Sequence, residues 1–187
     1  MKLSHIRSSL AILLFLAGCG PANVNFSQME KPAPSPELRN FEPFVGDWTW
    51  EAQRIPAEGD PMKWSGTAHW EWALGGTYLK GEMTSSGEGQ SFNSEGYWGW
   101  HPKRKTYVWW LLNDWGYPQE GTATFDADEK LWTMDFQGVG LDGTTSYGTY
   151  TVHVLDENTL EWTLDEWADP TRFAIKKLQM TGAYRRK

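Results

Sequence analysis

The side chains best suited to binding chemistry in this sequence are tryptophans. Thirteen are present, all beyond residue 47, and three pairs are two residues apart: Trp48/Trp50, Trp70/Trp72 and Trp98/Trp100. Residues at this spacing point to the same face of a β-strand, so each pair places two indoles side by side. Indoles can fill a hydrophobic core, line a pocket for a flat or apolar molecule, or stack on sugar rings. The spacing alone leaves these three uses open.

The face on which an indole lies separates these uses. Tryptophans inside a closed sheet share the face of Trp48, whereas those of an exposed sugar-stacking platform take the opposite face. Adjacent Trp109 and Trp110 must occupy both faces, so we expect at least one of them outside the interior. The candidate ligand contacts on the interior face are Trp50, Trp70, Trp72, Tyr78, Trp98 and Trp100.

Catalytic and metal-binding patterns are missing from the sequence. His69, His101 and His153 share no metal-ligand spacing. No Gly-x-Ser-x-Gly elbow, phosphate-binding glycine loop or dinucleotide fingerprint is present. Acids beside aromatics, at Asp114 and at Asp165-Glu166, could form a carboxylate pair for general acid–base catalysis, but acidic strand ends are more often solvated. We therefore expect a binding protein without a metal or cofactor rather than an enzyme.

The elements that would position these side chains are strands. Between residues 64 and 72, tryptophan and small residues alternate with polar ones, which is typical of a half-buried strand. Turn residues such as Asp142-Gly143 separate the alternating segments, so consecutive strands should pair as antiparallel hairpins. The ten expected strands cover about residues 44–54, 64–72, 76–86, 90–101, 104–115, 119–127, 130–139, 144–155, 159–167 and 171–184.

A meander of ten strands exposes two sheet edges unless it closes on itself. We therefore predict an all-β fold, a single antiparallel up-and-down barrel, with a two-sheet sandwich as the alternative. Ser35-Pro36-Glu37 provides an N-cap, a first-turn proline and a first-turn acid, which predict a short helix to about Phe41 at the barrel's entrance.

Two resemblances support the barrel. Gly46-Asp47-Trp48 opens the first strand and Arg185 follows the last, which resembles the lipocalin (calycin) pattern. That pattern implies that Gly46, Trp48 and Arg185 close the barrel base, with the basic side chain over the indole. Residues 38–184 are also similar to a family of secreted, lipocalin-like bacterial proteins of unknown function. The matching segments include residues 44–48 (FVGDW), 74–82 (LGGTYLKGE), 96–102 (GYWGWHP) and 107–110 (YVWW).

The amino terminus resembles that of a bacterial lipoprotein. Lys2 and Arg7 flank the start of a short apolar segment, and residues 16–19 (LAGC) match the lipobox. The resemblance implies removal of residues 1–18 and lipidation of Cys19, the only cysteine. Gly20 in place of the usual retention Asp implies transport to the outer membrane. Residues 19–37 would form a flexible Pro-rich tether to a barrel domain, residues 38–187.

These observations define the expected function. A formal net charge of −7 should repel nucleic acid. We expect a monomeric protein, lipid-anchored in the cell envelope and facing the periplasm or the surface, whose barrel binds a small apolar or aromatic molecule. The alternatives are a glycan-binding or structural envelope module and, third, an enzyme on the same scaffold.

Overall fold

The computed structural model describes residues 27, 29–56, 59–140, 142–173 and 176–187. The chain divides into two units, residues 1–32 and 33–187. In the first unit, residues 27 and 29–32 are described, and all of them are exposed. The predicted signal peptide and Cys19 lie outside the described residues, as do residues 20–26 and 28 of the predicted tether. Among the residues that are described, no helix has the length and apolar content needed to span a bilayer.

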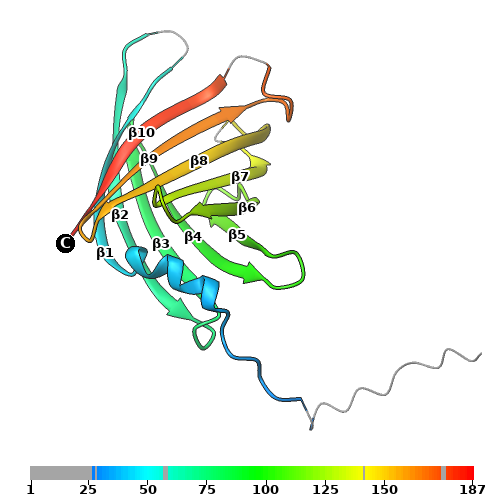
Figure 1. Cartoon of the computed structure of the whole chain (residues 1–187). Helices are drawn as coiled ribbons and strands as arrows, with labels where there is room; N and C mark the ends of the chain where they lie inside the picture. The colour runs from blue at the N-terminus through cyan, green and yellow to red at the C-terminus, as the bar shows by residue number, and fades with distance from the viewer. Residues whose placement is uncertain (1–26, 28, 57–58, 141, 174–175) are drawn as a thin grey trace, which may run out of the picture. The chain divides into compact units, whose positions relative to one another are not determined.

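Ten antiparallel strands in the second unit form a closed barrel (Figure 1). Each strand pairs with the next one along the chain, and β10 pairs with β1. The prediction of a ten-stranded, up-and-down, lipocalin-like barrel is therefore confirmed, and the sandwich alternative is wrong. The strands are β1 (Gly46–Arg54), β2 (Met62–Ala73), β3 (Tyr78–Gly87), β4 (Gln90–His101), β5 (Thr106–Asn113), β6 (Gln119–Asp126), β7 (Leu131–Val139), β8 (Thr145–Asp156), β9 (Thr159–Trp167) and β10 (Lys176–Arg186).

The largest difference from the predicted strands is the start of β10, at Lys176 rather than 171. A turn after β9 explains the delay. The Thr171 backbone N–H donates to the Asp169 carboxylate over 2.9 Å, and Arg172 has φ +60°. Such an aspartate turn competes with strand pairing for the backbone.

A short 3-10 helix, η2 (Pro36–Phe44), covers the end of the barrel at which β1 begins (Figure 1). It starts at the predicted proline and continues past the predicted end at Phe41. Its buried face consists of Leu38, Phe41 and Phe44. The Phe41 ring stacks on Trp132 inside the barrel, with 4.5 Å between centroids and 7° between planes. The helix therefore plugs this end with aromatic side chains.

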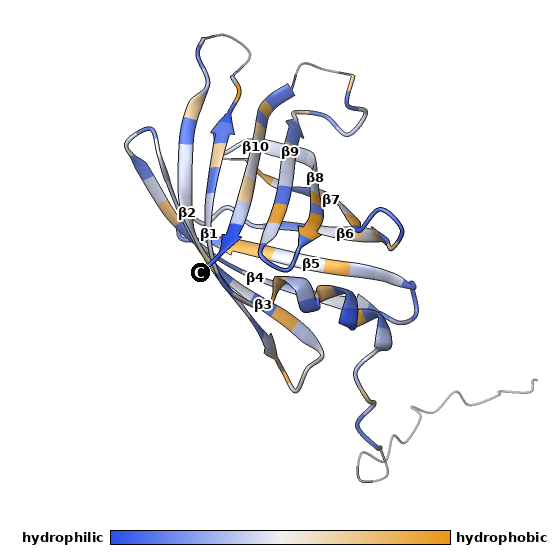
Figure 2. Ribbon diagram, turned by 60° about the vertical axis from the view of Figure 1, so that its left-hand side comes forward, coloured by the Kyte–Doolittle hydropathy of each residue, from blue (hydrophilic) through white to orange (hydrophobic). Residues whose placement is uncertain are grey.

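Side chains alternate between the interior and the outer face along each strand. The pattern is strict in β1, where every second residue from Trp48 to Ala52 is buried. Hydrophilic and hydrophobic bands accordingly follow one another along strands such as β9 and β10 (Figure 2). This is the alternation expected of an antiparallel sheet with one buried face.

Glycines make room for the indoles inside the barrel. A Cβ on Gly66 would lie 2.7 Å from the Trp50 ring. A Cβ on Gly81 would lie 2.2 Å from Trp70 Nε1 and 2.9 Å from Trp98. Real Cβ atoms essentially never approach so closely, so a larger residue would displace the rings. Each of these glycines thus lies opposite a tryptophan on the neighbouring strand: Gly66 opposite Trp50 and Gly81 opposite Trp70.

Candidate functional site

An internal cavity of about 200 Å³ extends from η2 toward the opposite rim of the barrel. Phe41 and Phe44 of η2 border one end of it, and Ser85 and Gln119 lie toward the rim. Most of the remaining lining is aromatic or aliphatic. Its six tryptophans are Trp50, Trp64, Trp70, Trp98, Trp109 and Trp162.

Three of the six predicted contacts, Trp50, Trp70 and Trp98, line this cavity. Trp72 and Trp100 have the expected interior parity, but they pack against the core near η2 and lie outside the lining. The Trp100 ring, for example, meets Tyr107 edge-on at 4.9 Å. The sequence therefore identified the face of these two indoles but not their depth along the barrel.

Tyr78, the sixth candidate, points to the outer face, so its assignment to the interior is wrong. Its neighbour Leu79 is buried and pairs with the inward-facing Trp72 and Trp98, which forces Tyr78 outward. The Tyr78 ring covers Gly99, whose Cβ would lie 2.6 Å from it, and is 6.4 Å from Trp110. The turn before β3 sets this parity.

The cavity also includes aromatic residues that the sequence reasoning did not select. Trp109 lies inside and Trp110 lies outside with 40% of its surface exposed, as their adjacency predicted. Tyr150, Trp162 and Tyr184 form one wall, on β8, β9 and β10. The alternation Leu160, Trp162, Leu164 in β9 was the available signal for Trp162.

The polar groups deep in the cavity are neutral. The hydroxyl groups of Tyr150 and Tyr184 are 3.3 Å apart. Burial raises the pKa of Tyr184 to about 12 and the pKa of Tyr150 well above its usual value, so both remain phenols at physiological pH. The indole N–H groups of Trp109 and Trp162 have no hydrogen-bond acceptor among the described residues.

The charges at the rim compensate each other. Arg54, the only charged residue in the described lining, donates to both oxygens of Glu88, over 3.1 and 3.0 Å. The Glu88 carboxylate also accepts a 2.7 Å hydrogen bond from Trp64 Nε1, and this bond together with Arg54 lowers its pKa. The described lining thus presents no unpaired charge to a ligand.

A tryptophan and an arginine close the base of the barrel, which is the end covered by η2. The structure places Gly46 and Trp48 there, but Arg186, not the predicted Arg185, lies over the indole, 4.2 Å from its centroid. Trp48 pairs with Arg186 across β1 and β10, whereas Arg185 pairs with Thr49 and faces outward. A Cβ on Gly46, which has φ +124°, would lie 2.6 Å from the Arg186 guanidinium.

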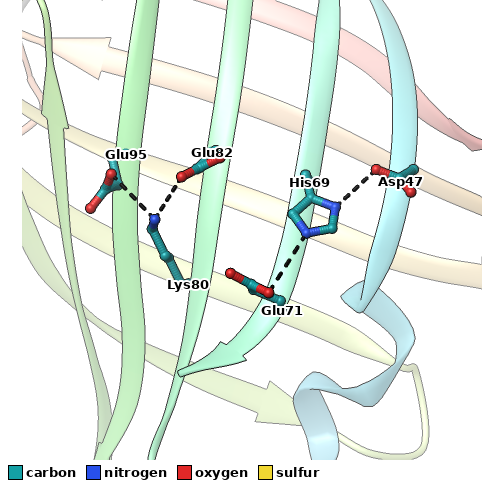
Figure 3. Close-up of polar contacts among 6 residues, drawn as sticks. All are labelled: Asp47, His69, Glu71, Lys80, Glu82 and Glu95. Carbon is teal, nitrogen blue, oxygen red and sulfur yellow. Dashed lines mark hydrogen bonds and ion pairs between the residues drawn. The ribbon is translucent and has the colours of Figure 1, made fainter. Parts of the chain in front are cut away.

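The outer face of β1 to β4 carries a row of charged side chains (Figure 3). Asp47, His69, Glu82 and Glu95 are in register on the four strands. His69 Nδ1 is 2.8 Å from Asp47, and Lys80 Nζ is 2.6 Å from Glu82 and 3.5 Å from Glu95. Exposed ion pairs of this kind contribute little stability. Within the described ranges, no three His, Cys, Asp or Glu side chains are grouped to hold a metal.

The acids considered for catalysis do not converge. Asp165 faces outward and pairs with Lys176 at 2.7 Å, whereas Glu166 is buried on the opposite face of β9. Burial raises the pKa of Glu166. Asp114 accepts a 2.9 Å hydrogen bond from Asn93 at the end of β5. The described lining of the cavity contains none of these three acids.

Fold and cavity together define a lipocalin-like barrel with a largely apolar interior cavity. Residues 33–186 match the family described as protein of unknown function (DUF1579), and the chain belongs to that family. No curated protein matches the chain.

Solved structures with similar folds include the following two. Rv2717c from M. tuberculosis is 14% identical, with a TM-score of 0.60 over 83% of this chain and 99% of that one. The S-type phycobiliprotein lyase CPES from Guillardia theta is 9% identical, with a TM-score of 0.53 over 80% and 91%. At these identities the likeness concerns the fold alone.

Proposed function

We propose that this protein binds a small, neutral, apolar or aromatic molecule inside its barrel, and that it does so as a lipid-anchored protein of the bacterial envelope. The cavity is the observation that carries the binding proposal. Its lining is mostly apolar with a few neutral polar side chains, which is the composition typical of small-molecule sites.

The size and lining of the cavity indicate the class of ligand. An apolar cavity of about 150 Å³ in another protein stays dry and binds benzene. A space of 200 Å³ bordered by indole rings suits a molecule of one or two rings. An ionised ligand would lose its hydration without gaining a partner, because Arg54 is already paired with Glu88.

Adjacent leucines on β5 provide a matched test. Leu111 lines the cavity, whereas Leu112 is 58% exposed on the outer face. We expect Leu111→Trp to reduce the affinity for naphthalene at least tenfold by filling the space, and Leu112→Trp to leave it unchanged. Calorimetric titration of the full chain measures both. Equal affinities in the two variants, or no binding of naphthalene by the wild type, would refute the proposal.

A second candidate function, glycan binding, is favoured by one observation on the outer face. Trp110, Glu120, Gln137 and Tyr147 are in register across β5 to β8, and they border a surface groove. An exposed indole beside amide and carboxylate groups suits stacking on, and hydrogen bonding to, a sugar chain.

Trp110→Ala tests this second function. We expect the variant to lose retention on immobilised envelope polysaccharide, while Leu155→Ala, which removes another side chain that is 40% exposed, keeps it. Equal retention of both variants, or no retention of the wild type, would count against glycan binding.

A further inference from the structure

One wall of the cavity is rich in hydrogen-bond donors. Tyr150 on β8, Trp162 on β9 and Tyr184 on β10 all line the cavity. The Trp162 ring is 5.4 Å from the Tyr150 ring and 6.2 Å from the Tyr184 ring. Gly182 permits this arrangement, because a Cβ there would lie 2.8 Å from the Trp162 indole. Two hydroxyl groups and one N–H are therefore gathered on three adjacent strands.

The hydrogen bonds within this wall do not use all of its protons. Between the hydroxyls of Tyr150 and Tyr184, 3.3 Å apart, one donates and the other accepts. The accepting hydroxyl keeps its own proton, and Trp162 Nε1 has no acceptor among the described residues. Buried donors are rarely left unpaired, because each one loses its hydrogen bond to water on folding.

In the described lining, the remaining walls carry few polar side chains. Trp98 and Trp109, with rings 14° from parallel, contribute aromatic surface. The neutral polar side chains Ser85, Ser94 and Gln119 lie toward the rim. A ligand that supplies an acceptor oxygen and no proton would complement the donors on β8 to β10.

We infer that the ligand is a neutral ring compound carrying a carbonyl oxygen, and that this oxygen is oriented toward the hydroxyl groups of Tyr150 and Tyr184. The inference rests on the proposed binding of a small molecule in the cavity. A carboxylate fits less well, because the deep part of the cavity contains no cation in its described lining. A hydrocarbon would fill the space but leave the donors unpaired.

Two compounds that differ by one carbonyl group, indane and 1-indanone, test the inference. We expect the full chain to bind both in equilibrium dialysis. In the double variant Tyr150→Phe/Tyr184→Phe, the affinity for 1-indanone should fall roughly tenfold, the value of about one hydrogen bond. The affinity for indane should change less than about twofold, because phenylalanine keeps both rings. Tyr97→Phe, on the outer face of β4, is the matched control and should change neither affinity.

An infrared measurement provides a second readout. The carbonyl stretch of bound 1-indanone should lie at lower frequency in the wild type than in the double variant, because a hydrogen-bond donor polarises the C=O bond. If neither compound binds, the proposed function itself is wrong. If both bind and the double variant keeps full affinity and the wild-type frequency, the cavity binds ligands but the assignment of a carbonyl to these tyrosines is wrong.

Discussion

Replacing Arg186 with alanine should destabilise the barrel, whereas replacing its neighbour Arg185 should not. The Arg186 guanidinium lies over Trp48 and donates three hydrogen bonds to backbone carbonyls. The acceptors are Val45 at 2.6 Å, Pro43 at 3.0 Å and Glu157 at 2.7 Å. These bonds tie the end of β10 to the end of η2 and to the β8–β9 turn.

The magnitude follows from these contacts. A hydrogen bond to a charged group contributes about 1.5–3 kcal/mol, and a cation–π contact about 0.5–2 kcal/mol. The site is only partly buried, so water can replace much of what the variant loses. We therefore expect a loss of about 3 kcal/mol, which lowers the Tm by about 6–12 °C for a domain of this size. Arg185 is exposed, and its replacement should change the free energy of unfolding by less than about 0.5 kcal/mol.

Urea denaturation followed by circular dichroism measures both variants against the wild type. Arg186→Lys should recover only part of the loss, because an ammonium group lacks the planar fork that reaches several carbonyls. If Arg186→Ala and Arg185→Ala unfold at the same urea concentration, our assignment of the closure to Arg186 is wrong.

Three other predictions concern the cavity, a surface acid and the anchor. Gly81→Ala should cost about 1–3 kcal/mol and weaken naphthalene binding, because its Cβ would displace Trp70 into the cavity; unchanged stability would contradict this. The pKa of Asp142, lowered to about 2 mainly by the Thr144 N–H, predicts that Asp142→Asn loses roughly 0.5 kcal/mol at pH 7, since the carboxylate is half exposed. That difference should shrink as the pH falls from about 4 through about 2, where the native carboxylate is protonated; a pH-independent difference would argue against it. Cys19→Ser should abolish palmitate labelling and release the protein from membranes; persistent labelling would exclude lipidation at this residue.

Strand number and closure were predictable because each strand carries its own period-two pattern and its own turn residues. The two errors at named residues, Tyr78 and Arg185, have one cause. Side chains on a strand alternate between its two faces. If the start or end of a strand is misplaced by one residue, the residues there are therefore assigned to the wrong face. Leu74, Gly75 and Gly76 all have positive φ in the turn before β3, and the sequence alone did not show where pairing resumes.

The face on which a tryptophan lies did not predict its position along the barrel axis. That position determines whether the indole belongs to the packed core or lines the cavity. Trp48 and Trp132 are fully buried near η2, where aromatic rings from the helix fill the interior. Toward the rim, no helix among the described residues contributes side chains. A ten-stranded barrel is also wider than the eight-stranded barrels whose side chains can fill the lumen. Glycines such as Gly81 let the indoles lie against the wall rather than meet in the centre. The same residue type therefore forms core at one end, lines a cavity beyond it, and at Trp110 faces the surroundings.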